Sequence, residues 1–301
     1  MGRARRAPVA ARERQLQDRA QARGAGEFRG RARRHRDPVL TKVFLDYDQK
    51  ALDDQYEQRV WVPHADEIIR RYGLQSDEIR KRIGEPRTER YGPTPPETLD
   101  IYGSGKKAFV FVHGGAWKRQ SSRENAFAAE GVVQTGAAYV ALNFALLPAV
   151  TLAEMVAQVC RGIEWSHANV AEEIVLCGHS SGGHLAGCAL TKTTVVKRAL
   201  LVSGIYDLLP VRLSARNDYV RLDERLEHQY SPIRHVEKIR CPVTVAWGER
   251  EAAEFYRQSS EFAKQLGAPT IVGKGLNHFE ICLTLADPRA PLGKAALDML
   301  R

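Results

Sequence analysis

The chain has 301 residues, of which 44% are hydrophobic, and its formal net charge is +9. This length and composition allow one large core to be buried. No run of about 18 apolar residues is present, so the sequence predicts no membrane-spanning segment and no membrane partner.

Basic character is concentrated in the first 38 residues. They contain twelve Arg, no Lys and four acidic residues, which accounts for +8 of the net charge. We therefore expect residues 39–301 to form a single, nearly neutral domain that does not bind nucleic acid. Residues 1–38 hold too few apolar side chains to pack, which predicts disorder. Three roles stay open for this tail: a solvated extension, an arm for nucleic acid or an acidic partner, and a targeting segment.

Periodicity along the rest of the chain predicts the fold class. Residues 47–82 carry amphipathic patterns for two or three helices, among them 54–59, 66–72 and 77–83. From about residue 97, buried-strand and helix patterns alternate, which indicates an α/β fold with a mostly parallel sheet between two helical layers. Further helices are expected at 123–134, 151–167, 251–266 and 292–300. The charged helical segment 208–233 interrupts the alternation and is predicted as a small cap.

The first motif with chemical meaning follows an apolar run at 108–112. This run lacks alternation, as expected for a strand covered on both faces. The next residues are His113-Gly114-Gly115-Ala116-Trp117, and an H-G-G segment after an early strand is typical of the oxyanion loop of serine hydrolases. We predict an oxyanion hole at Gly114, Gly115, Ala116 and Ser181, with the N–H of Gly115 or Ala116 acting together with that of Ser181.

A second motif, Gly178-His179-Ser180-Ser181-Gly182, joins an apolar strand at 174–177 to a small-residue helix at 183–190. A strand, G-x-S-x-G and a helix in this order form the nucleophile elbow of serine hydrolases. Glycine suits the sharp turn because neighbouring backbone comes close there. The pattern predicts Ser180 as the nucleophile. His179 and His184 show a spacing that would suit a metal, but one lies on the elbow and the other on the helix, so we expect no metal and no cofactor.

Three residues are candidates for the acid that would orient a catalytic histidine. The strand 242–247 ends in Gly248-Glu249-Arg250-Glu251, and Asp207 follows the strand 200–203. Either glutamate would be well placed to stabilise an imidazolium. Spacing alone does not separate Glu249 from Glu251.

The catalytic base is predicted as His278. It follows a short apolar strand at 270–272 and a glycine-containing loop, where the last member of a serine–acid–histidine order belongs. The other eight histidines precede the sheet, flank the serine or the oxyanion loop, or lie in polar segments: His35, His64, His113, His167, His179, His184, His228 and His235.

Over roughly residues 45–300 the chain resembles the arylformamidase (kynurenine formamidase) group of α/β-hydrolases. The resemblance is carried by the two glycine motifs and by three further tracts: 203–208 with 212–214, Glu254-Phe255-Tyr256-Arg257-Gln258-Ser259, and Asn277-His278-Phe279. It implies an α/β-hydrolase fold and a serine hydrolase that cleaves an aryl formamide or a related small amide through an acyl-enzyme. It also implies Glu251 as the acid, where the family usually has aspartate.

Other functions stay open at this point. Bacterial members of the group are also described as general esterases, so the alternative is a carboxylesterase for small acyl or aryl esters, or a carbamate or amide hydrolase. A catalytically silent ligand receptor is a further alternative, against which the intact Ser180 and His278 argue. Trp117 and Tyr206 are candidate walls of a pocket for an aryl substrate.

The partners and compartment are predicted only in outline. The expected partner is a small-molecule substrate. The oligomeric state stays open, with a homodimer as one alternative. Five cysteines without C-x-x-C spacing, mostly in apolar patterns, are expected to be reduced and buried. Reduced cysteines and the lack of a secretory segment predict a cytoplasmic enzyme.

Overall fold

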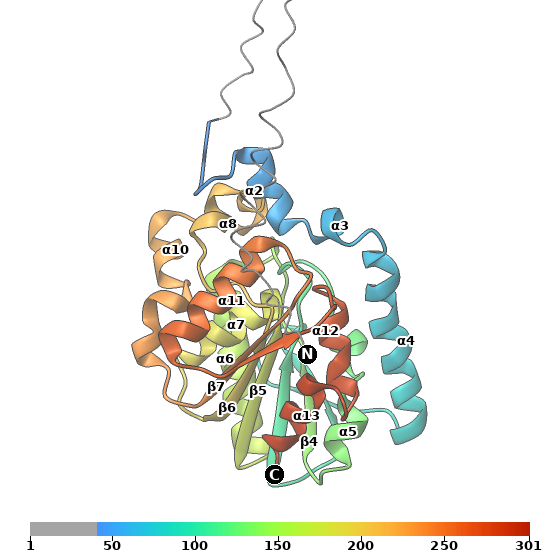
Figure 1. Cartoon of the computed structure of the whole chain (residues 1–301). Coiled ribbons are helices and arrows are strands. Elements are labelled where there is room, and N and C mark those ends of the chain that lie inside the picture. The colour runs from blue at the N-terminus through green and yellow to red at the C-terminus, as the bar shows by residue number, and fades with distance from the viewer. Residues whose placement is uncertain (1–40) are drawn as a thin grey trace, which may run out of the picture. The chain divides into compact units, whose positions relative to one another are not determined.

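An eight-stranded sheet runs through residues 41–301, the part of the chain that the computed structural model describes (Figure 1). The predictions for residues 1–38 lie outside the described residues. The strands are β1 (Arg87–Arg90), β2 (Thr98–Tyr102), β3 (Lys107–Val112), β4 (Ala138–Leu142), β5 (Glu173–His179), β6 (Val196–Val202), β7 (Val243–Gly248) and β8 (Thr270–Gly273).

The strand order is β1-β2-β4-β3-β5-β6-β7-β8. Strand β2 is antiparallel to both of its neighbours, and the six strands from β4 to β8 in this order are parallel. The prediction of a mostly parallel α/β sheet is confirmed. Since the parallel strands all end at one edge, the loops that follow β3, β5, β7 and β8 meet there.

Two hydrophobic clusters cover the two faces of the sheet. Along β3, Ala108, Val110 and Val112 belong to one cluster, and Phe109 and Phe111 belong to the other. Both sets are buried, which explains why β3 reads as an unbroken apolar run. Helices α6, α7 and α11 pack on the first face, and α4, α5 and α13 pack on the second.

The helices have the following bounds: α2 (Gln49–Tyr56), α3 (Gln58–Trp61), α4 (Ala65–Ile83), α5 (Ala129–Val133), α6 (Leu152–Asn169), α7 (Ser181–Leu190), α8 (Leu209–Leu213), α9 (Asn217–Val220), α10 (Glu224–Gln229), α11 (Ala253–Leu266), α12 (Glu280–Leu283) and α13 (Pro291–Asp298). Three 3₁₀ segments complete them: η1 (Ser122–Asn125), η2 (Pro232–Lys238) and η3 (Thr284–Ala286).

Three of the helix predictions need correction. The helix expected at 54–59 is interrupted at Glu57, the non-helical residue between α2 and α3. The separate helices expected at 66–72 and 77–83 are one continuous helix, α4, which runs through Gly73. A glycine inside a helix costs about 1 kcal/mol, and the buried side chains of Ile68, Tyr72 and Ile79 on the same helix offset that cost. The helix expected at 123–134 is instead divided into η1 and α5.

The segment between β6 and β7 contains α8, α9, α10 and η2, in the region predicted as a helical insertion. It contacts α2, the first helix within residues 41–301 (Figure 1). The Gln49 side chain donates a hydrogen bond to the Leu213 carbonyl, and the Asp53 carboxylate accepts one from the Ala215 N–H. These contacts hold α2 beside the insertion.

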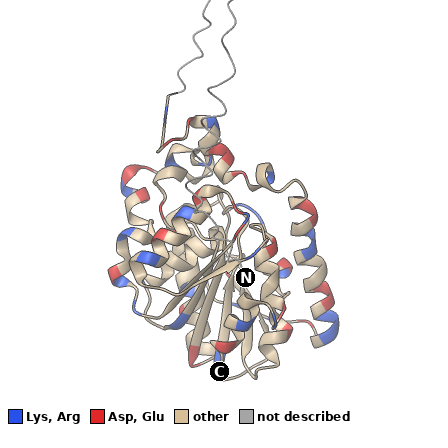
Figure 2. Ribbon diagram, in the orientation of Figure 1, with Lys and Arg blue, Asp and Glu red and all other residues tan. Residues whose placement is uncertain are grey.

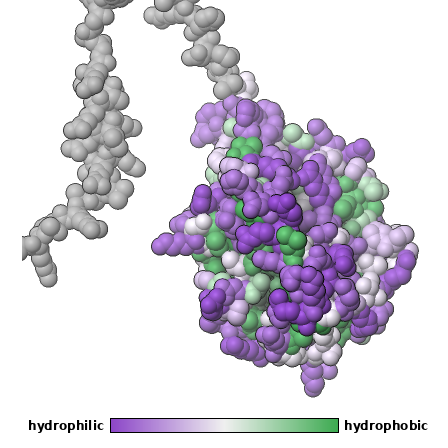
Figure 3. Space-filling view, turned by 90° about the vertical axis from the view of Figure 1, so that its right-hand side faces the viewer, coloured by the Kyte–Doolittle hydropathy of each residue, from purple (hydrophilic) through white to green (hydrophobic). Residues whose placement is uncertain are grey.

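The surface of the described part carries both charges. Figure 2 shows Lys and Arg interspersed with Asp and Glu over the helices. Figure 3 shows a face on which hydrophilic residues predominate and hydrophobic residues occur in small groups. None of the helices within residues 41–301 combines the length and the apolar character needed to cross a membrane.

Candidate active site

Ser180 lies in a strained turn between β5 and α7. Its φ is 57° and its ψ is −125°, and its N–H donates to the Val202 carbonyl over 2.9 Å. A Cβ at Gly178 would lie 2.3 Å from the Gly182 carbonyl oxygen, and one at Gly182 would lie 2.1 Å from that of Val112. Only glycine permits backbone segments to approach this closely. The flanking glycines therefore allow the turn that presents the Ser180 hydroxyl.

His278 connects the serine to an acid. Its Nε2 lies 2.9 Å from Ser180 Oγ, and its Nδ1 lies 2.9 Å from Glu251 Oε2. A carboxylate accepts but does not donate, so Nδ1 carries the proton and Nε2 accepts the hydrogen bond of the hydroxyl. The side chains of His278 and Glu251 are both buried. The three residues come from loops after β5, β7 and β8, which the parallel sheet brings to one edge.

The structure distinguishes between the three candidate acids. Glu251 Oε1 accepts hydrogen bonds from Ser203 Oγ at 2.6 Å and from the Gly248 N–H at 2.5 Å, which leaves Oε2 directed at His278. Glu249 instead accepts the Gly275 N–H at 2.7 Å on the surface. Asp207 accepts the Leu209 N–H and lies 3.4 Å from an arginine. Only Glu251 of these three contacts His278.

His179 fixes the loop that carries His278. Its Nε2–H donates to the His278 carbonyl over 2.8 Å, and the two rings lie 5.0 Å apart. Burial, with a smaller contribution from the neighbouring His278, lowers the pKa of His179 to about 3. The ring is therefore neutral near pH 7. The ring of Phe255 packs edge-on against His278 at 4.5 Å and limits its movement further.

The predicted oxyanion loop follows β3 and lies beside the serine. Gly115 and Ala116 have φ of 99° and 55°, and both line the cavity that contains Ser180. Within residues 41–301, no protein acceptor pairs with the N–H groups of Gly115, Ala116 or Ser181. Gly114 does not line the cavity; a Cβ there would lie 3.0 Å from the His179 carbonyl oxygen. Gly114 therefore allows the loop to approach the elbow, and the free donors lie on its neighbours.

Two further buried histidines hold the surrounding loops. His113 donates from Nδ1 to the Gly114 carbonyl at 2.9 Å, and burial lowers its pKa to about 4. His184 accepts the Trp117 indole N–H at 3.1 Å and donates to the Tyr230 carbonyl at 2.9 Å. Burial lowers its pKa to about 4 as well. Within residues 41–301, no three His, Cys, Asp or Glu side chains are grouped as metal ligands would be.

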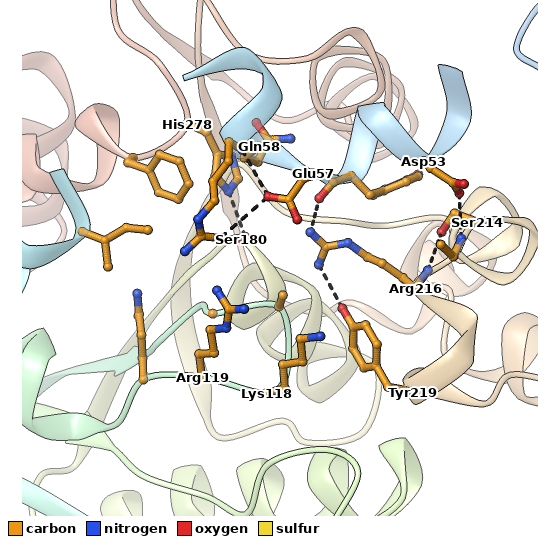
Figure 4. A pocket seen from close by; sticks show the side chains of 18 of the residues that line it. Asp53, Glu57, Gln58, Lys118, Arg119, Ser180, Ser214, Arg216, Tyr219 and His278 are labelled. Carbon is orange, nitrogen blue, oxygen red and sulfur yellow. Dashed lines mark hydrogen bonds and ion pairs between the residues drawn. The ribbon is translucent and has the colours of Figure 1, made fainter. Parts of the chain in front are cut away.

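A cavity of about 320 Å³ opens above Ser180 and His278 (Figure 4). Its other walls come from distant parts of the chain: α2 and α3, the loop 118–120, and residues 214–219, which comprise the turn after α8 and most of α9. The aromatic lining residues are Tyr56, Tyr219 and Phe279. Sequence reasoning did not find these walls. The amphipathic pattern over 47–82 was the one available signal, and it indicates a buried face without saying what it covers.

The prediction that Trp117 and Tyr206 form pocket walls is not supported, because neither lines this cavity. Trp117 is 1% exposed and packs edge-on against His184 at 5.4 Å. Tyr206 is fully buried and stacks on Phe262 at 4.2 Å. Both aromatic rings serve the core that supports the site.

Comparisons with known proteins agree with this geometry. The family described as BD-FAE matches residues 99–200. The kynurenine formamidase of Danio rerio is 31% identical to the chain over 286 residues, which cover 83% of this chain and 95% of that protein. The esterase LipQ of Mycobacterium tuberculosis is 28% identical, covering 70% of this chain and 58% of that protein.

A solved structure from Silicibacter sp. TM1040, described as a candidate thioesterase, superposes with a TM-score of 0.76 at 24% identity. The match covers 82% of this chain and 98% of that one, and it shows the shared α/β-hydrolase fold. The relation to the zebrafish protein extends over nearly the whole of that enzyme. The chain is thus a hydrolase, and it belongs to the kynurenine formamidase family.

Proposed function

We propose that this hydrolase cleaves an aryl formamide or a related small amide through an acyl-enzyme formed on Ser180. The observation that carries the proposal is the continuous hydrogen-bonded array Ser180–His278–Glu251, with both links at 2.9 Å. A serine hydroxyl needs an adjacent base that is itself oriented by a third group. Membership of the kynurenine formamidase family supports the choice of an aryl formamide.

The first half of the reaction forms the acyl-enzyme. His278 Nε2 takes the hydroxyl proton while Ser180 Oγ attacks the carbonyl carbon of the formamide. The resulting oxyanion is stabilised by the free N–H groups of Ser181 and of Gly115 or Ala116, each worth about 3 kcal/mol. The imidazolium is stabilised by the carboxylate of Glu251, which accepts the Nδ1–H of His278. His278 then protonates the amine as the C–N bond breaks, and the formyl group remains on Ser180.

The second half uses water in place of the amine. His278 takes a proton from the water, which attacks the formyl ester, and then returns that proton to Ser180 Oγ as the acid product leaves. The same groups would hydrolyse an ester, with an alcohol as the leaving group. Similarity to the esterase LipQ favours a carboxylesterase for small acyl or aryl esters as the second candidate function.

Paired kinetics on purified protein test the proposal. N-formyl-L-kynurenine and p-nitrophenyl acetate would be compared, with Ser180→Ala as the blank. We expect a kcat/KM of about 10⁴ M⁻¹s⁻¹ or more for the formamide, the lower end of the range of ordinary enzymes. Turnover of the ester alone would establish the second candidate. If neither is hydrolysed and Ser180 does not react with a fluorophosphonate, the proposal is wrong and a silent receptor becomes the leading alternative.

We also infer a cytoplasmic location. The support is that Cys160, Cys177, Cys188, Cys241 and Cys282 are all free, as expected in a reducing compartment. Burial raises the pKa of the Cys160 and Cys241 thiols to about 11, so neither is a reactive thiolate near pH 7.

A further inference from the structure

Three cationic side chains in the cavity above Ser180 have no carboxylate partner among residues 41–301. They are Lys118, Arg119 and Arg216, and all three line the same cavity as the serine. Figure 4 shows Lys118 and Arg119 rising from the loop below Ser180, while Arg216 reaches toward Ser180 from the side of the insertion. The positive groups thus converge beside the nucleophile from two separate segments.

Arg216 is held in place by neutral acceptors. Its guanidinium donates to the Tyr56 carbonyl and, at 3.3 Å, to the Tyr219 hydroxyl. The ring of Tyr219 also lies under the Lys118 ammonium, 4.0 Å from ring centroid to nitrogen. These contacts orient both cations without neutralising either. A guanidinium fixed in this way loses little side-chain freedom when it binds an anion.

The acidic residues of the cavity are already engaged elsewhere. Asp54 pairs with Lys50 at 2.5 Å, and Glu57 lies 3.7 Å from Arg59. Asp53 accepts hydrogen bonds from Gln49 and from the Ala215 N–H, and it lies beyond Arg216 at the end of the cavity away from Ser180 (Figure 4).

The fourth cation, Arg59, bonds to Asp66 through two nitrogens, at 2.9 and 2.7 Å. It is therefore occupied, unlike the other three. The charged lining residues and their ion-pair partners are five cations and four carboxylates, so one net positive charge is left. No described carboxylate lies within ion-pair distance of Lys118, Arg119 or Arg216.

We infer that Arg119 and Arg216, assisted by Lys118, bind a carboxylate of the substrate and thereby select anionic amides or esters. A carboxylate matches the two parallel N–H groups of a guanidinium, and a charged pair of this kind is stronger than a neutral hydrogen bond. Neutral substrates of the same shape would leave the three cations unpaired. The inference rests on the proposed function, since it concerns the group that is presented to Ser180.

Binding to the inactive Ser180→Ala protein tests this inference without needing turnover. Titration calorimetry would compare two matched pairs of probes. The pair 4-acetoxybenzoate and its methyl ester carries the charge on the leaving-group side. The pair monophenyl glutarate and its methyl ester carries it on the acyl side. We expect the anionic member of at least one pair to bind about 10-fold more tightly, which corresponds to about 1.4 kcal/mol.

Variants assign the preference to the named cations. In the Ser180→Ala background, Arg119→Gln and Arg216→Gln should each remove most of the preference and leave the affinity for the methyl ester unchanged. Arg59→Gln is the matched control, because it removes a cation of the same cavity that is already paired; it should keep the preference.

Two results would overturn the inference: equal affinities within both pairs, or a preference that survives in the Arg119→Gln/Arg216→Gln double variant. Hydrolysis of the four ester probes and of N-formyl-L-kynurenine by the wild-type protein is measured separately. Lack of hydrolysis of all five compounds with an intact binding preference would count against the proposed function and not against the carboxylate site.

Discussion

The imidazole of His179 donates its Nε2–H to the backbone carbonyl of His278 over 2.8 Å, so the residue before Ser180 holds the residue whose Nε2 faces the Ser180 hydroxyl. His179 ends β5, and His278 lies on the loop between β8 and α12. This single bond therefore ties the elbow to the loop of the base. Because the lowered pKa of His179 keeps its ring neutral, the ring adds no positive charge beside His278.

The first prediction concerns this bond. His179→Leu should lower kcat about 5-fold with little change in KM, because loss of one buried hydrogen bond of about 1 kcal/mol leaves His278 less well positioned. His179→Gln, which keeps an N–H donor, should lose less. Steady-state kinetics with unfolding curves for all three proteins provide the check. Equal losses of kcat in both variants would show that the bond does not position the base.

The second prediction separates the two glutamates that follow β7. Glu251→Gln should lower kcat by roughly 10⁴-fold, because the amide neither holds the required tautomer nor stabilises an imidazolium. Glu249→Gln alters an exposed loop residue and should stay within about twofold of the wild-type value, as is usual for surface substitutions. Side-by-side kinetics decide the matter, and comparable losses in the two variants would rule out the assignment of Glu251.

The site is predictable from sequence where its geometry is local. The elbow needs only a strand, two close-packed glycines and a helix, and all of these are encoded within 174–190. His278 is predictable because a loop after the last strand reaches the same edge of the sheet. The choice between Glu249 and Glu251 is not local, since it depends on Ser203 and the Gly248 N–H fixing one carboxylate oxygen.

The cavity walls were beyond sequence reasoning for a physical reason. They come from α2, the loop 118–120 and residues 214–219, and contacts between such distant segments leave no periodic signal. Trp117 shows that closeness in sequence to a site residue does not place a side chain in the cavity. It directly follows Ala116 of the predicted oxyanion loop, but its φ of 61° is a left-handed conformation that no strand or helix pattern predicts. Its ring packs into the core against His184 instead of into the cavity.

The third prediction tests the close packing of the elbow. Gly182→Ala should destabilise the fold by about 3 kcal/mol, at the upper end of the range for overpacking, because the clash is with backbone that cannot move aside. Gly131→Ala in α5 is the matched control; its nearest atom is 3.8 Å away, so it should gain about 0.5 kcal/mol from helix propensity. Urea unfolding measures both. A Gly182→Ala protein as stable as wild type would contradict the packing argument.

The fourth prediction concerns stability in acid. His113 and His184 have pKa values lowered to about 4 by burial, and His179 to about 3. Below pH 6.5 the unfolded chain takes up protons that the folded protein does not, so stability falls as the pH drops from about 6.5 toward 4. At pH 5 each of these histidines should lower the free energy of unfolding by about 2 kcal/mol relative to its value at pH 7.5.

Variants isolate the histidine contribution from that of other groups. Urea unfolding of wild type, His184→Asn and His228→Gln would be compared at pH 7.5 and pH 5. The Asn variant is expected to be less stable at both values, because it loses the bridge between Trp117 and the Tyr230 carbonyl. The informative quantity is the difference between the free energies of unfolding at pH 7.5 and at pH 5. That difference should shrink in the Asn variant, since one buried proton acceptor is gone, and stay unchanged when the exposed His228 is replaced. Identical differences in all three proteins would mean that His184 is not protonated on unfolding, contrary to the buried, neutral ring that the structure requires.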